Sequence, residues 1–208
     1  MSRHAALNAI PNILTGVRLF AGVVMFLILA GATGGVPILS AYLSPDDQFT
    51  LYRTAFWIFV IAGSTDWIDG YLARRWGAES RWGAILDPIA DKVLATGAIL
   101  GLLASGAVPQ IVIPCGLILF REFAVSALRE TMAGRVELPV TLFAKWKTVV
   151  QLTALAFQLF ARNWDGFGLS FDYLPHFQLF ADFLIWLAAI ITLWTGWQYF
   201  NEAQRQLK

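Results

Sequence analysis

The sequence predicts an all-α membrane protein with six transmembrane helices, folded as one domain over residues 1–208. Composition is the first reason, because 58% of the residues are hydrophobic and only 14% are charged, whereas soluble domains are nearer one half apolar and one quarter charged. Length is the second, since a bilayer core of roughly 30 Å needs about 20 apolar residues per helix and the chain has room for six such spans. The third is the alternation of lysine and arginine between connections, as membrane topology requires.

Six apolar runs are long enough to span a bilayer. The first contains Arg18 and precedes five more, so we expect an uncleaved helix rather than a secretory signal, with Arg18 reaching the cytoplasmic headgroups outside any site. At its start, Asn12 and Thr15 are available to cap the helix or to face a polar site. The fourth run holds Cys115, the single cysteine, which we expect to be a buried thiol. The runs lie at about 13–32, 54–74, 84–104, 108–128, 142–161 and 178–200.

The basic residues predict the orientation in the membrane. When the connections are assigned alternately to two sides, all but two of the 15 lysines and arginines fall on one side; the exceptions are Arg53 and Arg162. The positive-inside rule therefore places both termini in the cytoplasm, together with the connections between the second and third and the fourth and fifth runs. The net charge of +1 and the lack of a long basic run give no reason to expect a nucleic-acid partner.

Four aspartates stand at the cytoplasmic ends of the second and third runs, where lipid would not tolerate them. Asp66 and Asp69 have i, i+3 spacing, and Asp87 and Asp91 have i, i+4 spacing, so each pair shares one helix face. A short connection makes the two helices neighbours, and the four carboxylates can converge. Their mutual repulsion would be relieved by cations. All-oxygen ligation favours Mg²⁺ or Mn²⁺, with Ca²⁺ as an alternative, and four carboxylates can bridge two ions.

The residues around the aspartates suit a substrate that carries phosphates. Gly70 and Ala73 remove side-chain bulk beside the acids, so a ligand can approach the helix closely. Arg74 can offer a bidentate fork to a phosphate oxygen. Gly83, four residues before Asp87, leaves similar room or allows close packing of the two helices. Taken one by one these residues have ordinary packing or capping roles, but the set together predicts a functional site.

These residues form the pattern Asp66-x2-Asp69-Gly70-x2-Ala73-Arg74-x8-Gly83-x3-Asp87-x3-Asp91, which resembles the full signature of the CDP-alcohol phosphatidyltransferases. The resemblance implies a homodimer with six transmembrane helices in a bacterial inner membrane, and a site with two divalent cations that opens to the cytoplasm. It implies that the four aspartates are metal ligands and that Asp91 is also the catalytic base. It further implies that the CDP moiety is bound along Gly70, Ala73 and Arg74, with which we group Asn12 and Thr15.

Within that family, three further segments resemble the phosphatidylglycerophosphate synthases. They begin at Pro11, at Arg121-Glu122 and at Lys145-Trp146-Lys147. The resemblance implies that CDP-diacylglycerol and sn-glycerol 3-phosphate are the substrates. An acceptor with its own phosphate needs more cations than Arg74, and four further basic residues can supply them on the cytoplasmic side. The alternative is that they are ordinary positive-inside residues, with Arg121 merely paired to Glu122 or Glu130. These four are Arg121, Arg129, Lys145 and Lys147.

Other functions remain open at the level of sequence. The acceptor could be inositol phosphate, serine or phosphatidylglycerol rather than glycerol 3-phosphate. A prenyltransferase also uses membrane aspartates and Mg²⁺, but its acids are closely spaced, and the only adjacent pair here is Asp46-Asp47 in an external connection. A cation transporter could use the four aspartates as an ion path, and it would show metal flux without nucleotide dependence.

Overall fold

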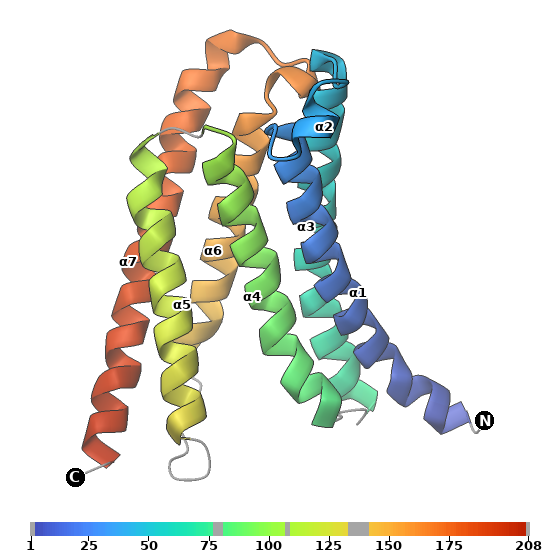
Figure 1. The fold of residues 1–208 in the computed structure, drawn as a ribbon. Helices are drawn as coiled ribbons and strands as arrows, with labels where there is room; N and C mark the ends of the chain where they lie inside the picture. Colours follow the sequence, from blue (N-terminus) through green and yellow to red (C-terminus); the bar gives the residue numbers. More distant parts are fainter. Residues whose placement is uncertain (1–2, 77–80, 107–108, 133–141, 207–208) are drawn as a thin grey trace. The chain divides into compact units, whose positions relative to one another are not determined.

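The structure is a computed structural model that describes residues 3–76, 81–106, 109–132 and 142–206 (Figure 1). Within these ranges the chain is helical, with six long helices, which confirms the predicted all-α class. They are α1 (Arg3–Ala32), α3 (Pro45–Trp76), α4 (Arg81–Ala104), α5 (Val112–Met132), α6 (Leu142–Arg162) and α7 (Leu174–Gln206). The short elements are α2 (Pro37–Ser40) and the 3₁₀ turns η1 (Pro109–Ile111), η2 (Asp165–Phe167) and η3 (Phe171–Tyr173).

Five of the six predicted apolar runs fall within one of the long helices, and the fourth, predicted at 108–128, corresponds to η1 followed by α5. Among the described residues, three helical stretches are long and apolar enough to cross a membrane: Asn12–Ala32, Pro109–Met132 and Phe171–Gln206. Helix α5, with 21 residues, is about 32 Å long at 1.5 Å per residue, which matches a bilayer core of roughly 30 Å. Large apolar side chains on these helices are open to the surroundings, as at Phe20 (69% exposed) and Phe120 (76%), which is typical of surfaces that meet lipid or another chain.

The second long helix begins earlier than its apolar run, because residues 44–47 form an N-terminal cap. The hydroxyl of Ser44 accepts the N–H of Asp47 at 3.2 Å, and the Asp47 carboxylate accepts both the N–H of Ser44 at 3.0 Å and its hydroxyl at 2.7 Å. This reciprocal arrangement is a capping box, and Pro45 stands at the first helical position, where its missing N–H costs nothing. Helix α3 therefore starts at Pro45 rather than near residue 54.

The chain divides into two compact units, of which the first comprises Met1–Gly106 and Arg162–Phe171. In it, α1 packs along both α3 and α4. The approach of α1 to α4 is close because glycines face the contact: a Cβ on Gly22 would lie 3.2 Å from the backbone of Leu94, and one on Gly101 would lie 2.4 Å from Leu29. Close backbone approach through small residues is how helices pack in a membrane.

A Schellman motif ends α1 and keeps the following connection short. Gly34, with φ of 83°, donates to the carbonyl of Gly31, and Gly35 donates to the carbonyl of Ala30 at 2.8 Å. This satisfies two carbonyls that the last turn would otherwise leave without a partner. The segment Arg162–Phe171 is fastened to the same unit, since Arg53 donates to the carbonyl of Gly166 at 3.3 Å.

The second unit comprises Ala107–Ala161 and Asp172–Lys208, and it contains α5, α6 and α7. Helix α5 packs against α7 through a core that includes Ile118 and Ile185, both fully buried. Cys115 lies in this core at 0% exposure, as the sequence predicts. Helix α6 contacts α7 through stacked rings of Phe157 and Phe177, whose centroids are 5.3 Å apart. It also contacts α5 and α7 through polar side chains.

Candidate active site

The acidic signature is divided between two helices of the first unit. Asp66 and Asp69 lie in the last three turns of α3, and Asp87 and Asp91 lie one turn apart in α4, where both are partly exposed. The convergence of all four carboxylates stays a prediction, because the side chains of Asp66 and Asp69 lie outside those that the structure describes. The same holds for the side chains of the other signature residues on α3, which are Gly70, Ala73 and Arg74.

Helix α1 presents two polar side chains to the acids of α4. The hydroxyl of Thr15 donates to Oδ1 of Asp87 at 2.5 Å, and Nη1 of Arg18 donates to Oδ1 of Asp91 at 3.3 Å. Thr15 and Arg18 are three residues apart, so they share one face of α1, and each is only 1% exposed. A hydrogen bond to a charged group is shorter and stronger than a neutral one. The two contacts therefore fix the orientation of both carboxylates.

The expectation for Arg18 was wrong. A snorkelling arginine would hold its guanidinium in the headgroup layer, but this side chain is buried and forms an ion pair with Asp91. The physical reason is that the fully buried guanidinium of Arg18 would be costly without an anion, and the partly exposed carboxylate of Asp91 compensates its charge. The sequence interpretation left Arg18 out of the candidate site, but its contact with Asp91 includes it there. Asn12, one turn before Thr15, is half-buried on the same helix.

The donor chemistry of the acidic site fits a hard divalent cation. The described ligand candidates, Asp87 and Asp91, offer only oxygen, and Thr15 adds a hydroxyl beside them. Oxygen donors are what Mg²⁺ and Mn²⁺ prefer. Among the side chains that the structure describes, no group of three or more histidine, cysteine, aspartate or glutamate residues is close enough to hold a metal. The predicted set extends beyond them to α3.

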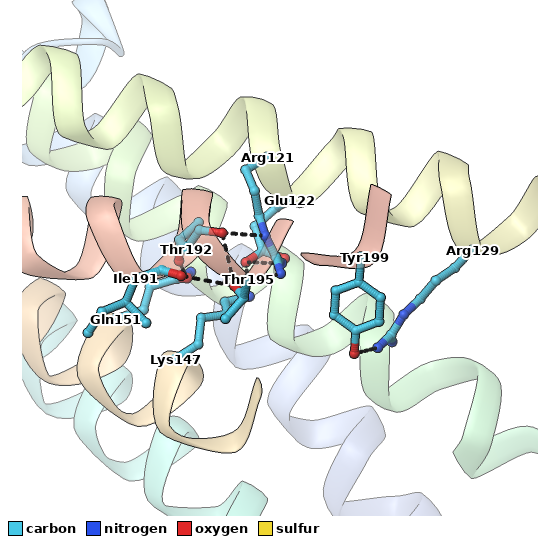
Figure 2. Close-up of polar contacts among 9 residues, drawn as sticks. All are labelled: Arg121, Glu122, Arg129, Lys147, Gln151, Ile191, Thr192, Thr195 and Tyr199. Atoms are coloured by element: carbon cyan, nitrogen blue, oxygen red, sulfur yellow. Dashed lines mark hydrogen bonds and ion pairs between the residues drawn. The ribbon is translucent and has the colours of Figure 1, made fainter. Parts of the chain in front are cut away.

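The second unit holds a buried polar cluster built from α5, α6 and α7 (Figure 2). The guanidinium of Arg121 donates through Nε to the carbonyl of Thr192 at 2.9 Å and through Nη2 to the hydroxyl of Thr195 at 3.0 Å. Its Nη1 lies 3.6 Å from Oε1 of Glu122, and the ammonium of Lys147 donates to the same oxygen. Arg121 is thereby held by α7, and Glu122 is held by α6.

A neighbouring contact lies two turns further along α5. Arg129 donates to the phenol oxygen of Tyr199 at 2.6 Å, and its guanidinium lies 4.8 Å from the centroid of that ring. Figure 2 shows Tyr199 on α7 beside Arg129. Of the four predicted phosphate-binding cations, Arg121 and Lys147 therefore meet at Glu122, whereas Arg129 contacts Tyr199. The side chain of Lys145 lies outside the described ones.

Sequence reasoning named Glu122 as a possible partner of Arg121 but missed the other partners that hold these cations. Glu122 was visible as a neighbour of Arg121 in an apolar run, which signals a buried pair, but its contact with Lys147 joins two helices that are separate in sequence. Thr192 and Thr195 have i, i+3 spacing in the last apolar run, which indicates a polar stripe without identifying its partner. Sequence reasoning also missed Gly196, which leaves space for the side chain of Arg121, because a Cβ at this position would lie 3.0 Å from it.

These features define a helical protein with long apolar helices, a carboxylate site in one unit and a buried cationic cluster in the other. The chain belongs to the CDP-alcohol phosphatidyltransferase family, whose model matches residues 8–194. This confirms the resemblance found in the aspartate signature.

Curated relatives cover much or nearly all of the chain. A protein of Haemophilus influenzae is 40% identical over 72% of this chain and 77% of its own length. One of Cereibacter sphaeroides is 35% identical over 96% of this chain and 97% of its own length. One of Escherichia coli is 37% identical over 72% and 78%. All three are named CDP-diacylglycerol–glycerol-3-phosphate 3-phosphatidyltransferase.

Proposed function

We propose that this protein transfers the phosphatidyl group from CDP-diacylglycerol to the primary hydroxyl of sn-glycerol 3-phosphate. The observation that carries the proposal is the relative from Cereibacter sphaeroides, which bears this activity in its name and matches 96% of the chain. In the reaction, the acceptor oxygen forms a bond to the phosphorus of the phosphatidyl group while the bond from that phosphorus to CMP breaks. The products are phosphatidylglycerophosphate and CMP.

The donor substrate would be bound in the first unit. Gly70 and Ala73 leave room along α3 for the cytidine diphosphate, and Arg74 offers charge to its phosphates. Asn12 and Thr15 extend the same polar surface from α1. We assign the hydroxyl proton to Asp91, whose Oδ1 is oriented by Arg18.

Two divalent cations, Mg²⁺ or Mn²⁺, complete this site in our proposal. Asp66, Asp69, Asp87 and Asp91 would hold them, and when bound they would offset the negative charge of the pyrophosphate and of the departing CMP. The contribution of the protein is to keep the carboxylates in place, as Thr15 does for Asp87 at 2.5 Å. Positioning and electrostatics then supply most of the acceleration.

The acceptor phosphate is assigned to the basic residues of the second unit, Arg121, Arg129, Lys145 and Lys147. Arg121 and Lys147 are buried, and a buried cation attracts an anion more strongly than a solvated one. A zwitterionic acceptor without a phosphate, such as serine, would need fewer of them. This favours glycerol 3-phosphate over serine, while inositol phosphate shares the required charge.

The setting of the reaction follows from its lipid substrate. We propose six membrane crossings in a bacterial inner membrane, with both termini and the site on the cytoplasmic side, and a homodimer as the assembly. The diacylglycerol tails then stay in lipid while the headgroup reaches the polar site. Helices α1, α5 and α7 supply the spans that length and composition already support.

The decisive experiment is CMP release by the purified protein with CDP-diacylglycerol and Mg²⁺. Glycerol 3-phosphate, inositol phosphate, serine and phosphatidylglycerol are compared as acceptors. We expect turnover with glycerol 3-phosphate and none with the other three, and loss of turnover on chelation with EDTA. Turnover with a different acceptor would overturn the acceptor assignment, and no CMP with any acceptor would overturn the function.

A matched pair of variants tests the acidic site in the same assay. Asp87→Asn should abolish CMP release while the protein stays folded, because removing a repelling charge does not harm the metal-free bundle. Asp46→Asn makes the same change at an exposed acid in the first turn of α3 and should keep full activity. An active Asp87→Asn variant would remove Asp87 from the site.

A further inference from the structure

Glu122 joins helices α5 and α6 of the second unit. Its side chain, on α5, is 13% exposed, and the side chains of Lys147 on α6 and Arg121 on α5 are 10% and 7% exposed. Both cations contact the same carboxylate oxygen of Glu122, Oε1. The ammonium of Lys147 donates to it, and Nη1 of Arg121 lies 3.6 Å away. One anion thus joins two cations that sequence separates by 26 residues.

The charges in this cluster do not cancel. Two cations and one carboxylate leave a surplus of one positive charge among Arg121, Glu122 and Lys147. Without the carboxylate, two desolvated like charges would face each other, and each would move toward solvent. Glu122 therefore keeps both cations inside the bundle. It also leaves a net positive charge, which one further anion can neutralise.

Helix α7 fixes the orientation of the guanidinium independently of Glu122. Thr192 and Thr195 accept two of its N–H groups (Figure 2). Gly196 leaves the space in which the side chain lies, since a Cβ there would lie 3.0 Å from it. The hydroxyl of Thr195 is itself held, since it lies 2.9 Å from the carbonyl of Thr192. Such a preorganised donor loses little freedom when it binds an anion.

We propose that Glu122 is a positioning residue for the phosphate of the acceptor, acting through Lys147 and Arg121. This rests on the proposed function, because it presumes that the cluster receives the phosphate of glycerol 3-phosphate. Glu122 does not touch the acceptor. It holds the ammonium of Lys147 beside the guanidinium of Arg121, so that one phosphate group meets both.

The test is the steady-state kinetics of the full-length protein with Glu122→Gln, which keeps the shape and removes the charge. We expect KM for glycerol 3-phosphate to rise about tenfold, with kcat and KM for CDP-diacylglycerol changing less than twofold. Inhibition by inorganic phosphate should weaken by the same factor. Glu122→Asp, which restores the charge on a shorter side chain, should recover part of the loss. The matched control is Glu130→Gln, an exposed glutamate on the same helix, which should leave every parameter unchanged.

A swap variant keeps the proposal testable if Glu122→Gln does not fold. Glu122→Lys combined with Lys147→Glu preserves the ion pair and the net charge but exchanges the positions of anion and cation. We expect it to fold and still to show a raised KM for glycerol 3-phosphate. A wild-type KM in the swap variant would show that the pair is only structural, and an unchanged KM in Glu122→Gln would equally overturn the proposal.

The failure of this inference is distinct from failure of the proposed function. If the wild-type protein shows no turnover with glycerol 3-phosphate, the function itself is overturned. If the wild-type protein turns over glycerol 3-phosphate and Glu122→Gln lowers kcat without a change in the KM for glycerol 3-phosphate, the function stands and the positioning role of Glu122 is wrong.

Discussion

At the scale of single residues, the hydroxyl of Thr15 has the clearest role in the acidic site. It is buried and donates to Asp87 at 2.5 Å, and a hydrogen bond to a charged group contributes about 1.5–3 kcal/mol. Thr15→Val removes the hydroxyl and keeps the shape, so we expect kcat/KM for CDP-diacylglycerol to fall at least tenfold. Thr15→Ser should retain most of the activity, as measured by CMP release.

The control for that substitution is Thr54→Val. Thr54 is exposed on α3, and its hydroxyl donates only to the carbonyl of Thr50 in its own helix. Full activity in both Thr15→Val and Thr54→Val would mean that the hydroxyl of Thr15 has no part in orienting Asp87.

The residue scale also shows where sequence reasoning reaches its limit. The aspartates could be singled out as site candidates because acidic residues at helical spacing are unusual in an apolar chain, and the structure brings Thr15, another candidate, to Asp87. Arg18 could not, because an arginine near the end of an apolar run has the same sequence signature whether it snorkels to the surface or pairs inside the protein. Only the packing of α1 on α4 decides between these, and that packing depends on contacts between segments about 73 residues apart.

At the scale of elements, the first turn of α3 should respond to acid. Hydrogen bonds from the hydroxyl and the backbone N–H of Ser44 lower the pKa of Asp47 from its ordinary value of 3.8. Because the folded pKa lies below the unfolded one, the cap stabilises the helix above pH 3.8 and this contribution is lost as the pH falls through the folded pKa. The protection factors of the amides in the first turn, which compare exchange with its intrinsic rate at the same pH, should therefore fall below about pH 4, and Ser44→Ala should return the pKa of Asp47 toward 3.8.

The contact of α1 with α4 gives a second prediction for these elements. Gly22→Ala places a Cβ 3.2 Å from the backbone of Leu94, which cannot move aside like a flexible side chain. The two helices must separate by a few tenths of an ångström, so we expect a lower Tm and reduced CMP release, because Thr15 and Arg18 are then displaced from Asp87 and Asp91. Gly16→Ala is the control, since nothing lies within 4 Å of the added carbon. Equal Tm values for the two variants would contradict the close-packing argument.

At the scale of the whole molecule, hydrophobic runs predicted the long helices well and their boundaries less well. An apolar run shows only how long the hydrophobic part of a helix is. The helix itself extends beyond the run where polar residues form its first turn, as they do in α3, which Ser44 and Asp47 cap. The division into two units was not visible in the sequence, because Arg162–Phe171 follows α6 in the chain and yet belongs with the first unit. That assignment depends on contacts such as Arg53 with Gly166, which no local pattern encodes.

The number of membrane crossings determines on which side the last helix ends. With six crossings, the end of α7 lies on the same side as the start of α1, whereas the three spans supported by length and composition alone would place it on the opposite side. In a Cys115→Ala background, which has no other cysteine, single substitutions Asp46→Cys and Gln204→Cys can be labelled with a membrane-impermeant maleimide in intact spheroplasts. We expect labelling at position 46 without permeabilisation and at position 204 only after it, because both are exposed but face opposite compartments. Labelling of both positions in intact spheroplasts would contradict six crossings and would remove the cytoplasmic assignment of the C-terminal end of α7.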